Sequence, residues 1–342
     1  MKSFQVLFLM MFCYAVNSFS QTETMHCCNM NSSTILNGHQ TQAGMWMISY
    51  SYMNTNMQNN YTGTTKVSDQ TIFEKYLMSP VNMHMDMHML TGMYGFSNKL
   101  SLMVMVDYNY MNMRMKMVAG AMNMGMGPSP MSMKSTSQGF GDTKISGLYK
   151  LYSANGHSLS ADVGFSLPTG SIHKTEKVDI SHYGDKEVYM MQTGSGTVNW
   201  LPGISYIYQQ TKYSLGAEAT ALIHPYFNRL GYKLGNEYSI NAWYTYEWLK
   251  NATVTLRLNY TASGKIQGYD PDISAVTEPA ANPQNYGGSF LKGYLGLAYY
   301  FTDGSLKNTK ISAEFGRPLY QYFNGIQTAA NFNSMVSWAL IF

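Results

Sequence analysis

Hydrophobic and polar residues alternate with a period of two along most of this chain. In segment 157–168, for example, Leu159 and Val163 share one face, and Ser160 and Asp162 share the other. Such alternation is typical of β-strands with one apolar and one polar face, and no long helical period interrupts it. About twelve segments carry the pattern: 43–56, 81–94, 99–113, 139–152, 157–168, 196–209, 211–224, 236–249, 252–264, 288–301, 308–318 and 327–342.

The connections between these segments alternate between short and long. Short links at 95–98, 153–156 and 250–251 alternate with long ones such as 57–80, 114–138 and 169–195. Each segment is long enough for a tilted strand to cross a bilayer, and short turns opposite long loops are typical of outer-membrane barrels. We therefore predict an all-β fold, a closed antiparallel transmembrane β-barrel of about twelve strands in a bacterial outer membrane. The alternative is a soluble secreted β-sandwich or lectin-like barrel.

The two ends of the chain agree with a barrel. Residues 1–20 combine Lys2, an apolar stretch and small residues before Gln21, which predicts a secretory signal peptide. We expect residues 21–42 to form a periplasmic tail and residues 43–342 to form the barrel. An even strand number places both termini in the periplasm, and the apolar last strand ends on the aromatic Phe342, as strands read by the barrel-insertion machinery do.

Composition narrows the functional classes. Only 12% of residues are charged, against about 25% in ordinary proteins. The net charge is +3, which argues against a nucleic-acid partner. Mean hydropathy is −0.21, and no apolar run long enough for a helical span follows the N-terminus. No Gly-x-Ser-x-Gly motif marks a nucleophile, so we expect no enzyme. The expected surroundings are outer-membrane lipid.

Several motifs occur together in one order along the chain. The set resembles the bacterial outer-membrane transporter family named after the meta-pathway of phenol degradation, and it extends from about residue 80 to the C-terminus. The resemblance implies a channel-like barrel and says little about its cargo. The motifs are Tyr94-Gly95-Phe96-Ser97-Asn98-Lys99-Leu100-Ser101-Leu102, Gly139-Phe140-Gly141-Asp142, Gly164-Phe165-Ser166-Leu167-Pro168-Thr169-Gly170, Gln192-Thr193-Gly194-Ser195-Gly196, Ser312-Ala313-Glu314-Phe315-Gly316-Arg317-Pro318-Leu319-Tyr320-Gln321 and Asn324-Gly325.

Methionine is concentrated in one part of the chain. The sequence holds 29 Met residues, and 21 of them lie between Met45 and Met133. This Met-rich segment, 45–133, departs from what the resemblance implies. A barrel that needed Met only as apolar filler would distribute it evenly, so the segment is a candidate for soft-metal chemistry.

In segment 81–94, Met and polar residues occupy opposite faces. Because the lipid-facing side should be apolar, we predict that Met83 and the Met residues at alternate positions to Met89 face lipid. His84, Asp86 and His88 would then face the lumen. The next segment places Met103, Met105, Asp107, Met111 and Met113 on its predicted inward face. Thioether and imidazole groups suit Cu(I), and by analogy Ag(I).

Two further groups could bind the same ions. An outer loop is predicted to carry Met115, Met117, Met122, Met124 and Met126, and the N-terminal tail carries His26, Cys27 and Cys28. Thiolates bind Cu(I) or Zn tightly, so the tail could exchange ions with a periplasmic metal carrier. The adjacent cysteines could instead form a vicinal disulfide or a redox pair.

The sequence leaves several functions open. The first hypothesis is an outer-membrane channel-like barrel that binds or passes soft metal ions, with copper as the first candidate, without a required cofactor. The second is a channel for small apolar or aromatic compounds, in which Met provides an adaptable lining. The third is a structural barrel that does not conduct. The loop Met runs also fit low-complexity sequence, and the His-Asp-His triplet also fits ordinary lumen polarity.

Overall fold

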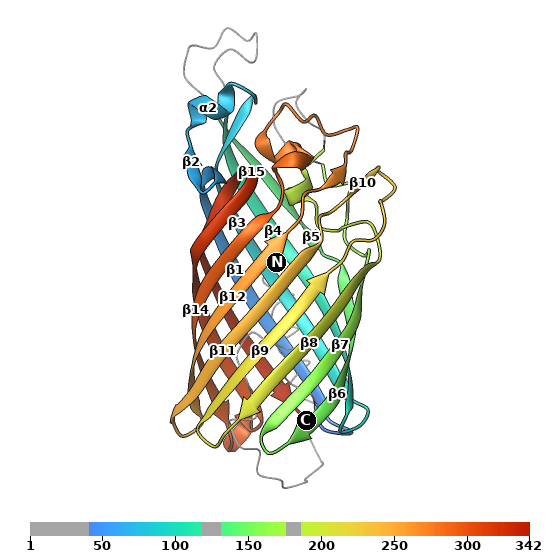
Figure 1. Ribbon diagram of the computed structural model, residues 1–342, viewed down its shortest axis with the longest axis vertical. Coiled ribbons are helices and arrows are strands. Elements are labelled where there is room, and N and C mark those ends of the chain that lie inside the picture. Colours follow the sequence, from blue (N-terminus) through green and yellow to red (C-terminus); the bar gives the residue numbers. More distant parts are fainter. Residues whose placement is uncertain (1–40, 118–130, 176–185) are drawn as a thin grey trace.

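Antiparallel strands pair in chain order and close on themselves into a barrel (Figure 1). The computed structural model describes residues 41–117, 131–175 and 186–342. The sheet follows the order β15-β14-β12-β11-β9-β8-β7-β6-β4-β3-β1, and β15 also pairs with β1. This last pairing leaves no free edge in the barrel wall, as a bilayer requires. None of the described helices is both long and apolar enough to cross a membrane.

The wall strands are joined by small accessory elements. In chain order the elements are β1 (Trp46–Gly63), β2 (Thr65–Val67), α2 (Asp69–Phe73), β3 (Met78–Gly95), β4 (Leu100–Met117), β5 (Met131–Phe140), β6 (Thr143–Ala154), β7 (His157–Leu167), η3 (Tyr189–Met191), β8 (Asn199–Gln209), β9 (Tyr213–Leu222), β10 (Tyr232–Lys233), β11 (Glu237–Leu249), β12 (Ala252–Ser263), β13 (Gln267–Gly268), η4 (Pro279–Ala281), η5 (Pro283–Asn285), β14 (Gly288–Phe301), η6 (Gly304–Leu306) and β15 (Thr309–Ile341).

The long strand β15 contributes two positions to the wall. Residues 309–323 pair with β14, and residues 327–341 pair with β1 in the opposite direction. Gln321 bonds both the N–H and the carbonyl of Ala330, which ties the two arms together. With β15 counted twice and β5 and β6 as one continuing strand, the described residues form twelve wall positions. Each contains one of the predicted segments, so the predicted fold is confirmed.

A sharp turn between β5 and β6 explains one of the sequence motifs. A side chain at Gly141 would place its Cβ 2.0 Å from a carboxylate oxygen of Asp107, so only glycine fits there. The next residue, Asp142, accepts hydrogen bonds from the backbone N–H of Gly170 and from both the backbone and the hydroxyl of Ser195. Three motifs that are far apart in the sequence therefore meet at one junction, which fixes the long loop that follows β7.

The two ends of the barrel differ. Short turns join β3 to β4, β6 to β7 and β11 to β12 at one end, and β2, α2, β10, β13 and η3–η5 belong to the long connections at the other (Figure 1). The chain finishes at the short-turn end, where Trp46 and Phe342 exchange two backbone hydrogen bonds of 2.7 and 2.9 Å. The predicted alternation of loop lengths is confirmed.

Most inward side chains toward the short-turn end are polar, apart from a small apolar cluster of Met47, Met93, Met103 and Leu148. The polar ones include a buried ion pair in which Arg257 bonds Glu314 through two nitrogens at 2.9 and 2.5 Å. A third nitrogen of Arg257 donates to Asn241, and the guanidinium lies over the ring of Tyr294. This network joins β11, β12, β14 and β15 across four adjacent wall positions.

We expect Glu314→Gln to lower the free energy of unfolding by about 3–5 kcal/mol, because it leaves the Arg257 charge buried without its partner. Urea-dependent unfolding in lipid vesicles, followed by tryptophan fluorescence, measures the change. Arg317→Gln is the matched control, since Arg317 is exposed on the outer face, and it should change stability by about 0.5 kcal/mol or less. Equal losses in both variants would contradict a structural role for the pair.

Candidate functional site

Methionine side chains line the inner surface of one side of the barrel. We call this surface, on β1, β3, β4 and β5, the methionine wall. The strands pair in register, so that Met83 lies between Met57 and Met113, and Met93 lies between Met47 and Met103. The described members of the wall are Met47, Met53, Met57, Met78, Met83, Met85, Met87, Met89, Met93, Met103, Met105, Met111, Met113, Met115, Met117 and Met133.

The predicted faces of β3 are reversed in the structure. Met83 is only 1% exposed and lies in the core inside the barrel, whereas His84 and His88 are exposed on the outer face. The phase of the strand is set nearer the short-turn end, where Leu90 points outward and Thr91 points inward. Because period two is maintained, every second residue toward Met83 is inward. The expectation that Met83–Met89 face lipid is therefore wrong.

His84, Asp86 and His88, which we expected to face the lumen, instead point outward. Together with Asn54 they form an outward polar row. Asp86 accepts hydrogen bonds of 2.7 Å from the Tyr52 hydroxyl and from the Asn54 amide. His88 shares a hydrogen bond of 2.7 Å with the Tyr50 hydroxyl. The inward placement of His84, Asp86 and His88 is wrong, so these groups line no path through the barrel.

The next strand agrees with the sequence analysis. Met103, Met105, Asp107, Met111 and Met113 all face inward, as predicted, and Met113 is only 1% exposed.

The predicted loop begins too early, because β4 continues to Met117. Met115 and Met117 are therefore buried wall residues and not loop residues. Of the other predicted ligands, His26, Cys27, Cys28, Met122, Met124 and Met126 lie outside the described residues.

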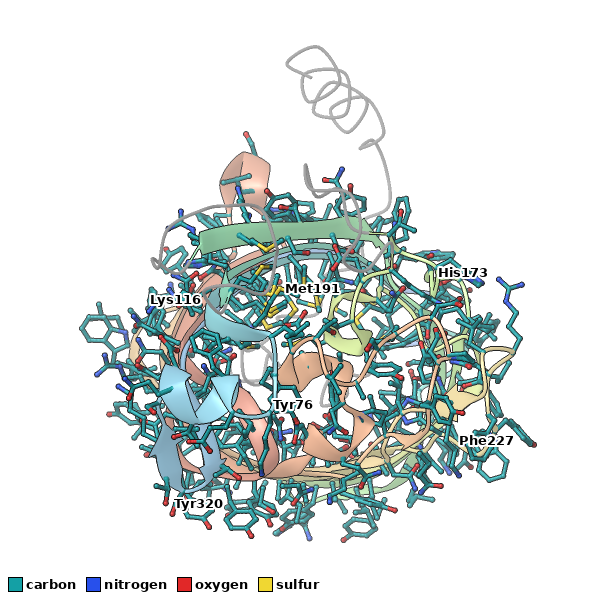
Figure 2. All side chains as sticks on the ribbon, turned by 90° about the horizontal axis from the view of Figure 1, so that it is seen from above. Tyr76, Lys116, His173, Met191, Phe227 and Tyr320 are labelled. Atoms are coloured by element: carbon teal, nitrogen blue, oxygen red, sulfur yellow. The ribbon has the colours of Figure 1, made fainter. Side chains whose placement is uncertain are left out.

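Two long loops, between β7 and β8 and between β12 and β14, pack inside the barrel against the methionine wall. Met191 of η3 is fully buried in one apolar cluster with wall residues such as Met113 and with Ala281 of η4. Figure 2 shows sulfur atoms gathered around Met191 inside the ring of strands. The loops are fastened by an ion pair between Lys186 and Asp270, both buried.

The first of these loops is also bound to the wall itself. The Ser135 hydroxyl of β5 donates to the Glu187 carboxylate at 2.7 Å. Burial raises the pKa of that carboxyl, and the hydrogen bond from Ser135 opposes the rise. Asp142 thus holds both ends of the loop between β7 and β8, through Gly170 and Ser195, and Ser135 holds the loop at Glu187.

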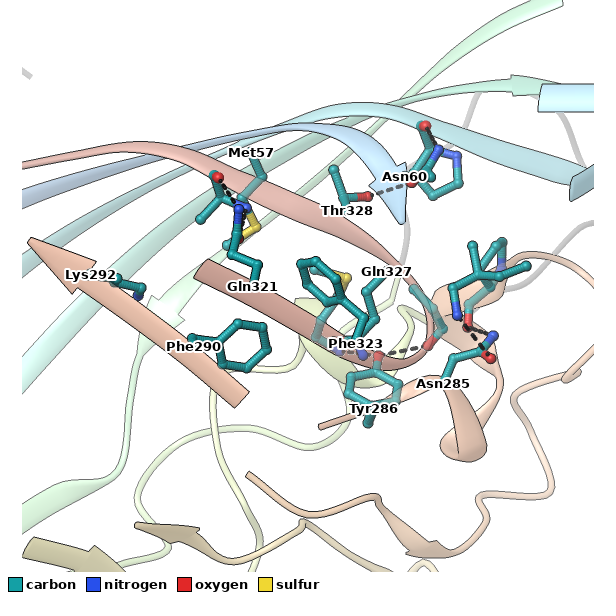
Figure 3. Close-up of a pocket in the computed structure, with 16 residues that line it drawn as sticks. Met57, Asn60, Asn285, Tyr286, Phe290, Lys292, Gln321, Phe323, Gln327 and Thr328 are labelled. Atoms are coloured by element: carbon teal, nitrogen blue, oxygen red, sulfur yellow. Dashed lines mark hydrogen bonds between the residues drawn. The ribbon is translucent and has the colours of Figure 1, made fainter. Parts of the chain in front are cut away.

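A cavity of about 220 Å³ lies between the loops and the strands β1, β14 and β15 (Figure 3). Its lining is mostly apolar and contains a single charged side chain, that of Lys292. The lining residues are Met57, Asn60, Pro80, Met190, Pro279, Ala280, Asn285, Tyr286, Phe290, Lys292, Gln321, Phe323, Ile326, Gln327, Thr328 and Ala330.

Most of this cavity was not predicted from the sequence. Inward parity on segment 288–301 could have identified Phe290 and Lys292, because both lie on the same face of a predicted strand. The loop residues Asn285 and Tyr286 belong to a long connection without periodicity, so no pattern placed them inside the barrel.

The site offers thioethers and aromatic rings more than hard metal ligands. Within residues 41–117, 131–175 and 186–342, no three His, Cys, Asp or Glu side chains are grouped to hold a metal ion. Met is adaptable and polarisable, so a Met-lined surface suits apolar solutes and soft cations alike.

The reversed phase of β3 is tested by spin labels at two adjacent positions. In a background with Cys13, Cys27 and Cys28 replaced by Ser, we prepare His84→Cys and Met83→Cys. The label at position 84 should collide freely with lipid-soluble oxygen, because this residue is exposed on the outer face. The label at position 83 should give an immobilised spectrum with little oxygen contact. The opposite pattern would show that His84 faces the lumen and Met83 faces lipid, as the sequence predicted.

Comparison with solved structures identifies the type of fold. No protein-family model matches the sequence, and a search of curated proteins found no relative; the phenol meta-pathway resemblance therefore stays a prediction. Among solved structures, an outer membrane channel from Pseudomonas putida F1 is similar with a TM-score of 0.55 and 13% identity over 89% of this chain and 97% of that one. The Ralstonia pickettii toluene transporter TbuX gives 0.44 and 9% over 88% and 90%, and a mutant of the monoaromatic hydrocarbon channel TodX gives 0.43 and 10% over 88% and 91%. The chain thus has the fold of a bacterial outer-membrane channel barrel.

Proposed function

We propose that this chain is an outer-membrane channel for small apolar or aromatic organic solutes, with the long-loop end outside the cell. The observation that carries the proposal is the cavity between the inner loops and the wall. An apolar cavity of about 150 Å³ is enough to hold benzene, and this one has about 220 Å³. Its walls include Phe290, Phe323 and Met57.

The surroundings of the cavity support passage and not only binding. The loops that cover it carry short 3₁₀ turns, η3 to η5, and side chains such as Met190 that can change rotamer. Toward the short-turn end the inward surface of β11, β12, β14 and β15 becomes largely polar, with Ser, Thr and Asn side chains and the Arg257–Glu314 pair. A solute would move from the apolar cavity into a part of the lumen lined by polar side chains. An apolar solute binds weakly there, which favours its release.

We expect Ala330→Phe to slow the entry of a small aromatic solute at least about tenfold, because the added ring fills part of the cavity. Uptake of radiolabelled toluene into vesicles that contain the purified barrel measures the effect. Ala219→Phe is the control, since Ala219 is exposed on the outer face and should leave uptake unchanged. Equal uptake by both variants and by barrel-free vesicles would refute the channel and favour a structural barrel.

Soft metal ions are the second candidate cargo, and one observation favours them. The wall gathers many thioethers in one buried cluster, including those of Met83, Met111 and Met115, together with Met191 from the loop. Cu(I) accepts such ligands, and Ag(I) can replace it as a probe.

Titration with Ag(I) distinguishes the two cargoes. Replacing Met83, Met111 and Met115 with Leu conserves volume approximately and removes the sulfur ligands. Metal transport predicts at least about tenfold weaker Ag(I) binding in this variant with unchanged toluene uptake. Equal Ag(I) binding by the variant and the natural protein would exclude Met83, Met111 and Met115 as the metal ligands.

A further inference from the structure

The polar groups that line the cavity are nearly all occupied by protein partners. The Asn60 amide donates to the carbonyl of Pro80 and accepts from Thr328. The Tyr286 hydroxyl donates to the carbonyl of Ala280 and accepts from the N–H of Met190. These groups are therefore structural, and they offer little hydrogen-bonding capacity to a solute.

The other amides on the lining are engaged in the same way. Gln321 bonds both backbone groups of Ala330. The Gln327 amide donates to the carbonyl of Gly287 at 2.7 Å, and the Asn285 amide donates to Tyr76 and to Pro279. The loops and the strand ends are thereby held around the cavity by its own polar rim.

Lys292 is different. Among the described residues, its ammonium has no hydrogen-bond partner and no ion-pair partner within 4 Å. Its cross-strand neighbours are Asn259 and Pro318, so no carboxylate lies opposite it. It is attracted by the more distant charge of Glu237 and repelled by that of Arg257. Each of the three nitrogens of the Arg257 guanidinium already donates a hydrogen bond, two to Glu314 and one to Asn241.

A partly buried cation beside an apolar surface selects among solutes. Lys292 follows Phe290 on the same inward face of β14, and Figure 3 shows both at the cavity with Gln321 nearby. A hydrogen bond between an ammonium and a carboxylate is stronger than a neutral one, and a low-dielectric lining strengthens it further. A cationic solute would be repelled.

We propose that the cavity takes a small organic anion, a carboxylate on an apolar or aromatic body. The carboxylate would bind the Lys292 ammonium, and the body would lie against Phe290, Phe323 and Met57. This inference deepens the proposed channel function and rests on it for transport, while binding in the cavity can be measured without transport.

Binding to the purified full-length barrel tests the proposal with benzoate, its neutral analogue benzamide and the cation benzylamine. Calorimetry at neutral pH should show benzoate binding at least about tenfold more tightly than benzamide, and benzylamine more weakly than both. Lys292→Met should abolish the preference for benzoate and keep the binding of benzamide. Lys292→Arg should retain most of the preference.

Controls separate this inference from the proposed channel. Lys212→Met, at an exposed turn, should behave as the natural protein does, and unfolding curves should show that every variant is folded. Retention of the benzoate preference by Lys292→Met would overturn the inference, and so would its absence from the natural protein. Loss of toluene uptake with a preserved, Lys292-dependent benzoate preference would refute the channel alone.

Discussion

The antiparallel pairing of β1 with the last arm of β15 is the interaction on which the rest of the structure depends. It extends from Met47 opposite Ile341 to Tyr61 opposite Gln327 and is completed by the bonds between Trp46 and Phe342. In a bilayer no water can satisfy an open edge, so the wall must close before it is stable. Closure joins the first and the last strands of the chain and fixes the register of every strand between them. The register in turn decides which residues face the lumen.

That dependence explains what the sequence could predict. Period-two alternation and loop lengths suffice for the number of strands and their antiparallel order, because each is a local pattern repeated many times. The predicted phase of β3 is wrong because it assumes that Met side chains face lipid. That assumption assigns Met83 to the outer face and His84 to the lumen. Met is apolar and flexible enough for either side, and the phase is decided by Leu90 and by pairing with β1 and β4.

The cavity depends on a different kind of information. The inward orientation of its strand residues, such as Phe290 and Lys292, can be predicted from the alternation along the strand. These residues line a cavity only because long loops fold back into the barrel. Those loops are placed by single contacts between distant segments, including Asp142 with Ser195 and Lys186 with Asp270. No periodic pattern in the sequence predicts such contacts. The methionine wall fits this arrangement, because a surface that must pack against irregular loops benefits from side chains that adapt their shape.

The outward polar row also affects the membrane around the protein. On β11 the outward residues stay apolar or aromatic from Trp248 to Tyr238, a height of about 24 Å at a tilt of ~45°. On β3 they do so only from Tyr94 to Leu90, about 10 Å, before His88 begins the polar row. Lipid beside β1 and β3 must therefore thin or admit head groups and water to a greater depth than lipid on the opposite side. The barrel would sit in an asymmetric belt of lipid, with the thinnest part of the membrane beside β1 and β3, behind their part of the methionine wall.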